Sequence, residues 1–120
     1  MSEKTRVLVV DDDEAIRHGT QLRLSVNGYE VDSAVDGCHA IEQVARFKPD
    51  VIVMDVRMPK MDGLTALAHL KSRDETASIP VIIASASPGD QNTSLDTGAR
   101  YFLCKPFASA SLLAAIESVC

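Results

Sequence analysis

Short runs of apolar residues alternate along this chain with longer amphipathic stretches. The clearest runs are residues 7–10, 51–54 and 81–84, and each is rich in β-branched side chains. Such runs are typical of strands that are buried on both faces of a parallel sheet. Apolar and polar residues alternate over 29–34, which predicts a weaker second strand, and residues 101–104 predict a fifth.

The segments between these strands carry apolar residues at helical spacing. The first predicted helix, 15–26, has Ile16, Leu22 and Val26 on roughly one face and is followed by Asn27-Gly28, a typical C-terminal stop. Asp62 is placed to cap the third helix. The predicted helices are 15–26, 36–47, 63–72, a short one at most over 92–97, and 110–119.

Five strands that alternate with helices indicate parallel pairing and right-handed crossovers. The predicted fold is therefore α/β, with a doubly wound five-stranded parallel sheet and helices on both faces. No internal repeat, linker or low-complexity segment divides the 120 residues. We expect a single domain over residues 1–120.

Composition excludes some classes of function. The formal net charge of −5 and the pI near 5.0 disfavour binding to nucleic acid or to an anionic membrane surface, which both require a basic face. The opening stretch "MSEKTR" leads into only four apolar residues, so it does not resemble a signal peptide, and no run is long enough to cross a bilayer.

The three cysteines, Cys38, Cys104 and Cys120, are widely spaced and form no CxxC pair. Neither a zinc site nor a thioredoxin-like motif is indicated. Reduced thiols in a cytoplasmic protein are the simplest interpretation.

Candidate chemistry gathers where the predicted strands end. In open α/β sheets, ligands bind beyond the carboxyl ends of the strands. The residues that follow or end the strands there are three carboxylates after the first strand, one carboxylate after the third, a hydroxyl and an ammonium: Asp11, Asp12, Asp13, Asp55, Ser85 and Lys105.

Clustered carboxylates repel one another, and a divalent cation would remove that repulsion. Ligands that are all oxygen favour Mg²⁺ over zinc. A hard cation beside a lysine and a hydroxyl suits a phosphoryl group. Asp55 stands alone at the end of a central strand, so it is the best candidate for a nucleophile that forms an acyl phosphate.

Simpler interpretations exist for several of these residues. Asp13 and Glu14 favour the positive N-terminus of the first helix, and Asp36 and Asp50 are typical cap or turn residues. Any one of the residues at the strand ends could be an ordinary loop residue. Their convergence from four strands favours a site.

Four stretches, "VLVVDDDE", "DVIVMDVRMPKMDG", "PVIIASAS" and "YFLCKPF", resemble in order and spacing the receiver domain of two-component response regulators of the chemotaxis-regulator type. The resemblance covers essentially the whole chain. It implies a flavodoxin-like sheet with the strand order 2-1-3-4-5.

The resemblance assigns a metal site and a phosphoryl site. Asp12 would bind Mg²⁺ directly and Asp11 would bind it through water, together with Asp55 and the backbone carbonyl of Arg57. Asp55 would be the phosphoacceptor, and Lys105 would pair with a phosphoryl oxygen. Three further residues would complete the switch: the hydroxyl of Ser85, the aromatic ring of Phe102, and Pro106, which holds Lys105 through a cis bond.

The implied function is a phosphorylation switch. A histidine kinase or a phosphotransfer protein would phosphorylate Asp55. The changed surface of the domain would then bind a downstream effector or an output domain of the same protein. The domain would act as a monomer or as a phosphorylation-dependent dimer. The segment between Ser85 and Lys105 is shorter than is usual in the family and contains Pro88-Gly89, which predicts a short or displaced fourth helix.

Three alternatives remain. A receiver-like module could interact with partners without taking phosphate. A phosphohydrolase of the haloacid dehalogenase type would need an aspartate two residues after the nucleophile, where this chain has Arg57, which cannot act as an acid. A flavin binder would need a phosphate loop after the first strand, where three aspartates would repel the phosphate.

Overall fold

The computed structural model describes residues 4–120, and the first three residues of the "MSEKTR" stretch lie outside the described part. Five strands alternate with five helices along this part of the chain. In chain order, these elements are β1 (Arg6–Val10), α1 (Glu14–Val26), β2 (Glu30–Ala34), α2 (Gly37–Phe47), β3 (Val51–Asp55), α3 (Gly63–Lys71), β4 (Val81–Ser85), α4 (Asp90–Thr97), β5 (Tyr101–Cys104) and α5 (Ser109–Val119).

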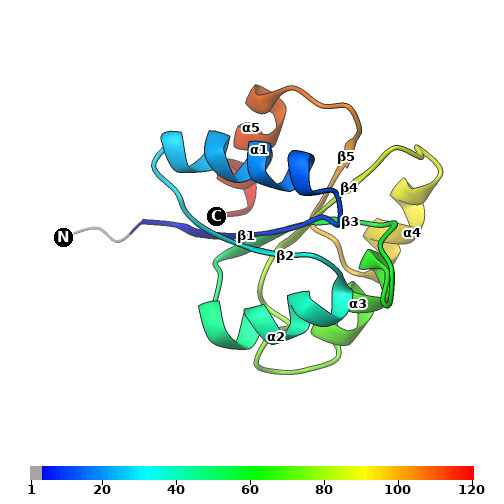
Figure 1. Cartoon of the computed structure of the whole chain (residues 1–120). Helices are drawn as coiled ribbons and strands as arrows, with labels where there is room; N and C mark the ends of the chain where they lie inside the picture. Colours follow the sequence, from blue (N-terminus) through cyan, green and yellow to red (C-terminus); the bar gives the residue numbers. More distant parts are fainter. Residues whose placement is uncertain (1–3) are drawn as a thin grey trace.

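All five strands are parallel and lie in the order β2-β1-β3-β4-β5. Helices α1 and α5 cover one face of this sheet, and α2, α3 and α4 lie on the other (Figure 1). The predicted doubly wound fold and its strand order are therefore confirmed.

The core is divided between the two faces of the sheet. Because side chains alternate along a strand, Val51 and Val53 of β3 pack toward α1 and α5, whereas Ile52 and Met54 pack toward α2 and α3. The equivalent residues of β1 and β4 divide in the same way. This double burial explains why the three central strands are apolar at nearly every position.

The apolar face predicted for α1 is not the face that packs against the sheet. Ile16, Leu22 and Val26 are all exposed, and 67% of Leu22 is accessible to solvent. Thr20 and Leu24 are buried instead, and Leu24 is 0% exposed. Thr20 and Leu24 are four residues apart and therefore lie on the same side of the helix. This is the side of α1 that packs against the sheet.

Aspartates begin three of the helices. The side chains of Asp13, Asp36 and Asp62 accept hydrogen bonds from backbone N–H groups one turn into α1, α2 and α3, at 3.0, 2.8 and 2.8 Å. Asp50 accepts a bond of 2.8 Å from the Arg6 N–H. The predicted roles of Asp13, Asp36 and Asp62 at helix starts are confirmed. Asp50 caps no helix within residues 4–120, and its side chain binds the start of β1 instead. None of the helices within residues 4–120 is long and apolar enough to cross a membrane.

The fourth helix is short, as predicted, although it begins at Asp90, two residues before the expected start. Its eight residues include a single large apolar side chain, Leu95, which is exposed. Ser94 is the one buried residue of this helix. A helix that is polar on nearly every side gains little from packing, so apolar burial contributes little to the attachment of α4.

The packing of α1 can be tested with two leucines of the same helix. Leu24→Ala removes a fully buried side chain and should lower the free energy of unfolding by about 2–5 kcal/mol. Leu22→Ala, at an exposed position, should change it by less than about 0.5 kcal/mol. Urea unfolding measures both values, and similar losses for the two variants would contradict the observed orientation of α1.

Candidate functional site

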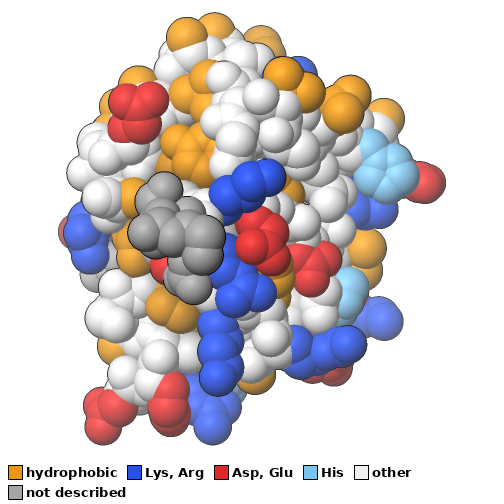
Figure 2. All heavy atoms as spheres, turned by 90° about the vertical axis from the view of Figure 1, so that its left-hand side faces the viewer, with side chains coloured by type: hydrophobic (Ala, Val, Ile, Leu, Met, Phe, Trp, Pro, Cys, Tyr) orange, Lys and Arg blue, Asp and Glu red, His pale blue; other side chains and the backbone are white. Residues whose placement is uncertain are grey.

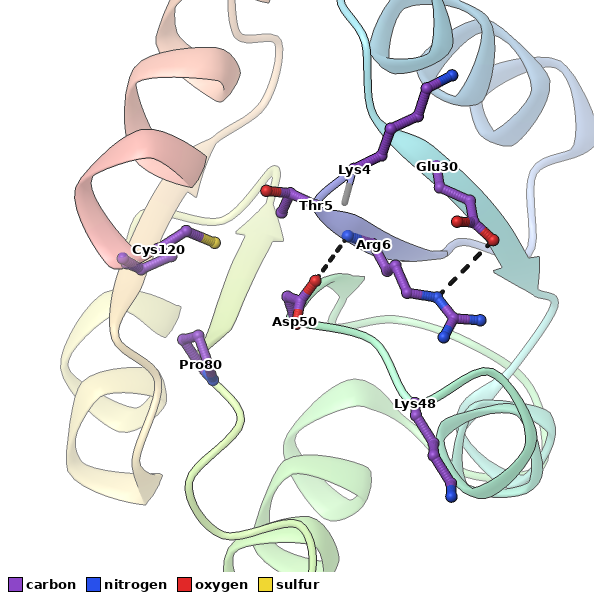
Figure 3. A pocket seen from close by; sticks show the side chains of 9 residues that line it. Lys4, Thr5, Arg6, Glu30, Lys48, Asp50, Pro80 and Cys120 are labelled. Atoms are coloured by element: carbon purple, nitrogen blue, oxygen red, sulfur yellow. Dashed lines mark hydrogen bonds and ion pairs between the residues drawn. The ribbon is translucent and has the colours of Figure 1, made fainter. Parts of the chain in front are cut away.

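The two ends of the sheet differ in charge. At the amino ends of the strands, basic side chains gather on the surface (Figure 2). They border a hollow of about 840 Å³ that Lys4, Arg6 and Lys48 help to line. There the Arg6 guanidinium pairs with Glu30, and the Arg6 backbone N–H donates to the Asp50 carboxylate (Figure 3). None of the predicted site residues lies at this end.

At the carboxyl ends of the strands, three of the predicted carboxylates meet. Asp11 follows β1 and is buried, Asp55 is the last residue of β3, and Asp12 is exposed beside them. One carboxylate oxygen from each residue lies within 4.8 Å of the others. Because β1 and β3 are adjacent parallel strands, their ends bring together residues that are 43 or 44 positions apart in sequence.

Lys105 lies between two of these carboxylates. Its Nζ donates to Asp11 Oδ2 at 3.0 Å and lies 3.1 Å from Asp55 Oδ2. Burial lowers the pKa of this ammonium group, but the hydrogen bonds and charges of Asp11 and Asp55 outweigh that effect and raise it. The peptide bond from Lys105 to Pro106 is cis, as predicted.

The orientation of the Asp55 carboxylate is held from two sides. Oδ1 accepts a hydrogen bond of 2.8 Å from the backbone N–H of Val56, and Oδ2 faces Lys105. Burial raises the pKa of Asp55, the charge and hydrogen bond of Lys105 oppose this, and the charge of Asp11 raises it further. The pKa is raised overall, because the effect of burial together with the charge of Asp11 outweighs the effect of Lys105 and of the Val56 N–H.

Gly63, the first residue of α3, packs closely against the backbone at the end of β3. Its N–H donates to the carbonyl of Val56 at 2.8 Å, and a Cβ at this position would overlap the backbone carbonyl of Asp55. Only a residue without a side chain allows this approach. The "DG" pair after β3 therefore combines two roles, since Asp62 caps the helix and Gly63 leaves room for the strand end.

The residues present fit a hard divalent cation. Asp12 makes no hydrogen bond through its carboxylate within residues 4–120, and no N–H of this region donates to the carbonyl oxygen of Arg57. A cation such as Mg²⁺ binds oxygen ligands of this kind and keeps several waters, so the cluster of Asp11, Asp12 and Asp55 supplies a suitable set.

The hydroxyl of Ser85 makes its hydrogen bonds outside this cluster. Ser85 ends β4, one residue beyond the partner of Asp55, and is 1% exposed. Its Oγ donates to Asp90 Oδ2 at 2.7 Å and accepts from the Ser87 N–H at 3.1 Å. The structure thus brings Ser85 to the same edge of the sheet, but its hydroxyl engages α4.

Asp90 was missed by the sequence analysis. The same Oδ2 that accepts from Ser85 also accepts from Arg57 Nη1 at 3.0 Å. The hydrogen bond from Ser85 is the largest cause that lowers the pKa of Asp90, and Arg57 lowers it further. An acidic residue in the first turn of a helix is expected simply because it interacts favourably with the helix dipole. The sequence around Asp90 therefore gives no sign of its contacts with Ser85 and Arg57.

Phe102 and Tyr101 face opposite sides of β5, as predicted. Phe102 is partly buried against the core on the α2 and α3 side of the sheet, whereas Tyr101 is exposed. The role of Phe102 as a switch aromatic stays a prediction.

A hollow of about 390 Å³ opens beside Asp55. Ile16 and Thr20 of α1 line one side of it, and Lys105, Pro106 and Phe107 line another. Its walls are mostly apolar, and Asp55 is one of the few charged residues that line it.

Comparison with known proteins decides the family. Residues 7–117 match the family model described as the response regulator receiver domain. This chain belongs to that family. The response regulator MprA of Mycobacterium leprae is 45% identical to this receiver domain over 114 residues, which make up 95% of the chain and 50% of the relative.

Solved structures agree with the assignment. The chemotaxis protein CheY4 of Vibrio cholerae has a TM-score of 0.91 at 31% identity, covering 98% of this chain and 100% of that one. The receiver domain of Francisella response regulator 1452 has a TM-score of 0.89 at 32% identity, covering 97% and 96%. Proteins of this family are regulators that interact with kinases and effectors. The chain spans about half the length of the curated relatives it matches.

The close approach of Gly63 to Asp55 leads to a test. Gly63→Ala should lower the free energy of unfolding by about 1–3 kcal/mol, because the new methyl group forces the strand end to move. Gly19→Ala, in the middle of α1 where space is open, should instead raise it by about 0.5–1 kcal/mol. Chemical denaturation distinguishes the two, and a neutral Gly63→Ala variant would be evidence against the contact.

Proposed function

We propose that this receiver domain, formed by residues 1–120, is a phosphorylation-activated switch of a cytoplasmic two-component system. A histidine kinase or a phosphotransfer protein presents phosphohistidine, and Asp55 accepts the phosphoryl group. The changed surface then acts on a downstream effector or on an output domain, consistent with relatives about twice as long as this chain.

The observation that carries the proposal is the ammonium of Lys105, 3.0 Å from Asp11 and 3.1 Å from Asp55. The ammonium group of Lys105, held beside two carboxylates at the edge of the hollow, is well placed to bind a phosphoryl group, which carries negative charge on several oxygens. As the phosphoryl group arrives, Lys105 can exchange one of its carboxylate contacts for a phosphoryl oxygen and so stabilise charge on the transferring group.

Asp55 would attack phosphorus through a carboxylate oxygen. The new bond joins that oxygen to phosphorus, the bond from phosphorus to the histidine nitrogen breaks, and the imidazole leaves with the electron pair. The Val56 N–H, 2.8 Å from Oδ1, keeps the carboxylate in one orientation during the attack.

Asp11, Asp12, Asp55 and the carbonyl of Arg57 would hold Mg²⁺, which supplies positive charge to offset the approach of an anionic phosphoryl group to an acidic site.

The acyl phosphate should be stored and hydrolysed only slowly. A phosphohydrolase of the haloacid dehalogenase type requires an acid at position 57, and here that side chain is a guanidinium that pairs with Asp90. After phosphorylation, Ser85 would turn its hydroxyl to a phosphoryl oxygen and Phe102 would move further inward, which shifts the domain toward its active form.

The phosphoacceptor is tested by mass spectrometry after incubation with Mg²⁺ and a small acyl-phosphate donor. The wild-type chain should gain the mass of one phosphoryl group, and Asp55→Asn should gain none, because an amide is not a nucleophile for this reaction. Asp13→Asn is the matched control, since Asn also caps α1 and should leave the mass gain intact. An equal gain in Asp55→Asn would show that another residue accepts the phosphate.

The metal site is tested by thermal unfolding with and without Mg²⁺. Ion at about ten times its dissociation constant should stabilise the wild-type domain by about 1.4 kcal/mol. Asp12→Asn should fold normally, because Asp12 is exposed, but should lose most of this gain. Asp13→Asn serves again as the control that retains it, and an undiminished gain in Asp12→Asn would contradict the assignment.

A further inference from the structure

We infer that Asp90 is a positioning residue of the switch, which holds the hydroxyl of Ser85 away from Asp55 until a phosphoryl group competes for it. The inference rests on the proposed function, because the competitor is a phosphoryl group on Asp55. It assigns to the start of α4 a direct role in sensing phosphorylation.

The competition follows from the valence of a hydroxyl group. Ser85 has one hydrogen to donate, and Asp90 Oδ2 accepts it at 2.7 Å. The N–H of Ser87 donates to the same Oγ at 3.1 Å, which helps to hold the hydroxyl in this direction. Ser85 is 1% exposed, so bulk water does not readily replace Asp90 as the acceptor. A phosphoryl oxygen can therefore gain this hydrogen only if Asp90 loses it.

Asp90 can lose Ser85 without being left unpaired. Arg57 Nη1 donates to the same carboxylate oxygen at 3.0 Å, and the side chain of Arg57 is 65% exposed, against 16% for Asp90. Ser85 thus approaches Asp90 from the protein side and Arg57 approaches it from the solvent side. When Ser85 turns to the phosphoryl group, the ion pair with Arg57 still compensates the carboxylate, so the two states can lie close in free energy.

The same contact links the start of α4 to the end of β4. Asp90 is the first residue of this helix, and the buried hydroxyl of Ser94 donates to the Asp90 carbonyl at 2.6 Å. The helix has no buried large apolar side chain, and the residue at its N-cap position, Gly89, makes no side-chain hydrogen bond to it. Because packing contributes little, release of Asp90 from Ser85 should loosen the whole first turn. Phosphorylation at Asp55 would in this way reach the surface of α4.

The test measures the affinity for beryllium fluoride, which stands for the phosphoryl group on Asp55, in the presence of Mg²⁺. Amide shifts in the full chain report the titration. Asp90→Ala should bind beryllium fluoride about three- to ten-fold more tightly than wild type, because a hydrogen bond to a charged group no longer opposes the movement of Ser85. Asp96→Ala is the matched control: it removes an exposed carboxylate from the same helix and should change the affinity less than two-fold.

The decisive comparison repeats both variants in a Ser85→Ala background. Without the hydroxyl there is nothing to compete for, so Asp90→Ala should then alter the affinity less than two-fold. A gain of the same size in both backgrounds would mean that Asp90 acts through Arg57 or through charge alone, and would overturn the inference. If Asp90→Ala does not fold, Asp90→Asn keeps a weaker, neutral acceptor and should give a smaller gain that also disappears with Ser85→Ala.

Amide hydrogen exchange gives a second, independent measurement. Peptides that cover residues 90–97 should exchange faster in wild type with beryllium fluoride and in Asp90→Ala without it, and Asp96→Ala without it should resemble free wild type. Protection of α4 that is unchanged in Asp90→Ala would overturn the inference. If wild type failed to bind beryllium fluoride at all, the proposed function itself would fall, whereas normal binding with no effect of Asp90→Ala would remove this inference alone.

Discussion

The site depends on one ammonium group. Lys105 Nζ lies within about 3 Å of carboxylates from two different strands, and it is a cation inside an acidic cluster. Without it, Asp11 and Asp55 would face each other across a partly buried space with no compensating charge, which costs far more than an exposed repulsion. That charge is placed by the buried carboxylate of Asp11 and by the carboxylate of Asp55, which the Val56 N–H orients. Lys105 therefore offsets part of the charge where the carboxylates of Asp11 and Asp55 meet.

Backbone geometry makes this arrangement possible. Parallel strands end at a common edge, so the residue after each strand is delivered to one place whatever the intervening sequence. Asp13 and Asp62 cap the helices that leave this edge, and Gly63 lets α3 approach the end of β3 closely. Structural aspartates and site aspartates are therefore neighbours in sequence, yet they differ in function because their carboxylates meet different partners.

Helix α4, which follows β4, is not held by apolar packing. Helix α4 has one large apolar side chain, which is exposed, and its first residue is tied to Ser85 and Arg57 through a single carboxylate oxygen. An element held mainly by polar contacts can change its attachment for a small free-energy difference, whereas a helix such as α2 or α5 would have to expose core residues. The competition inferred for the Ser85 hydroxyl depends on this weak attachment of α4. It would connect phosphorylation of Asp55 to the surface of α4.

The hydrophobic pattern was sufficient to predict five strands in parallel pairing, because runs of apolar β-branched residues that alternate with helical patterns are compatible with few other topologies. The strand order followed from the resemblance to the receiver family. The sequence also identified Asp11, Asp12, Asp55, Ser85 and Lys105 at the strand ends. The tertiary structure alone decided which face of α1 is buried, because exposed apolar residues such as Leu22 produce the same periodicity as buried ones. It alone placed Asp90 against Ser85, since a contact between a strand end and a helix start depends on how the loop between them folds, and neither residue's type or spacing encodes that distance.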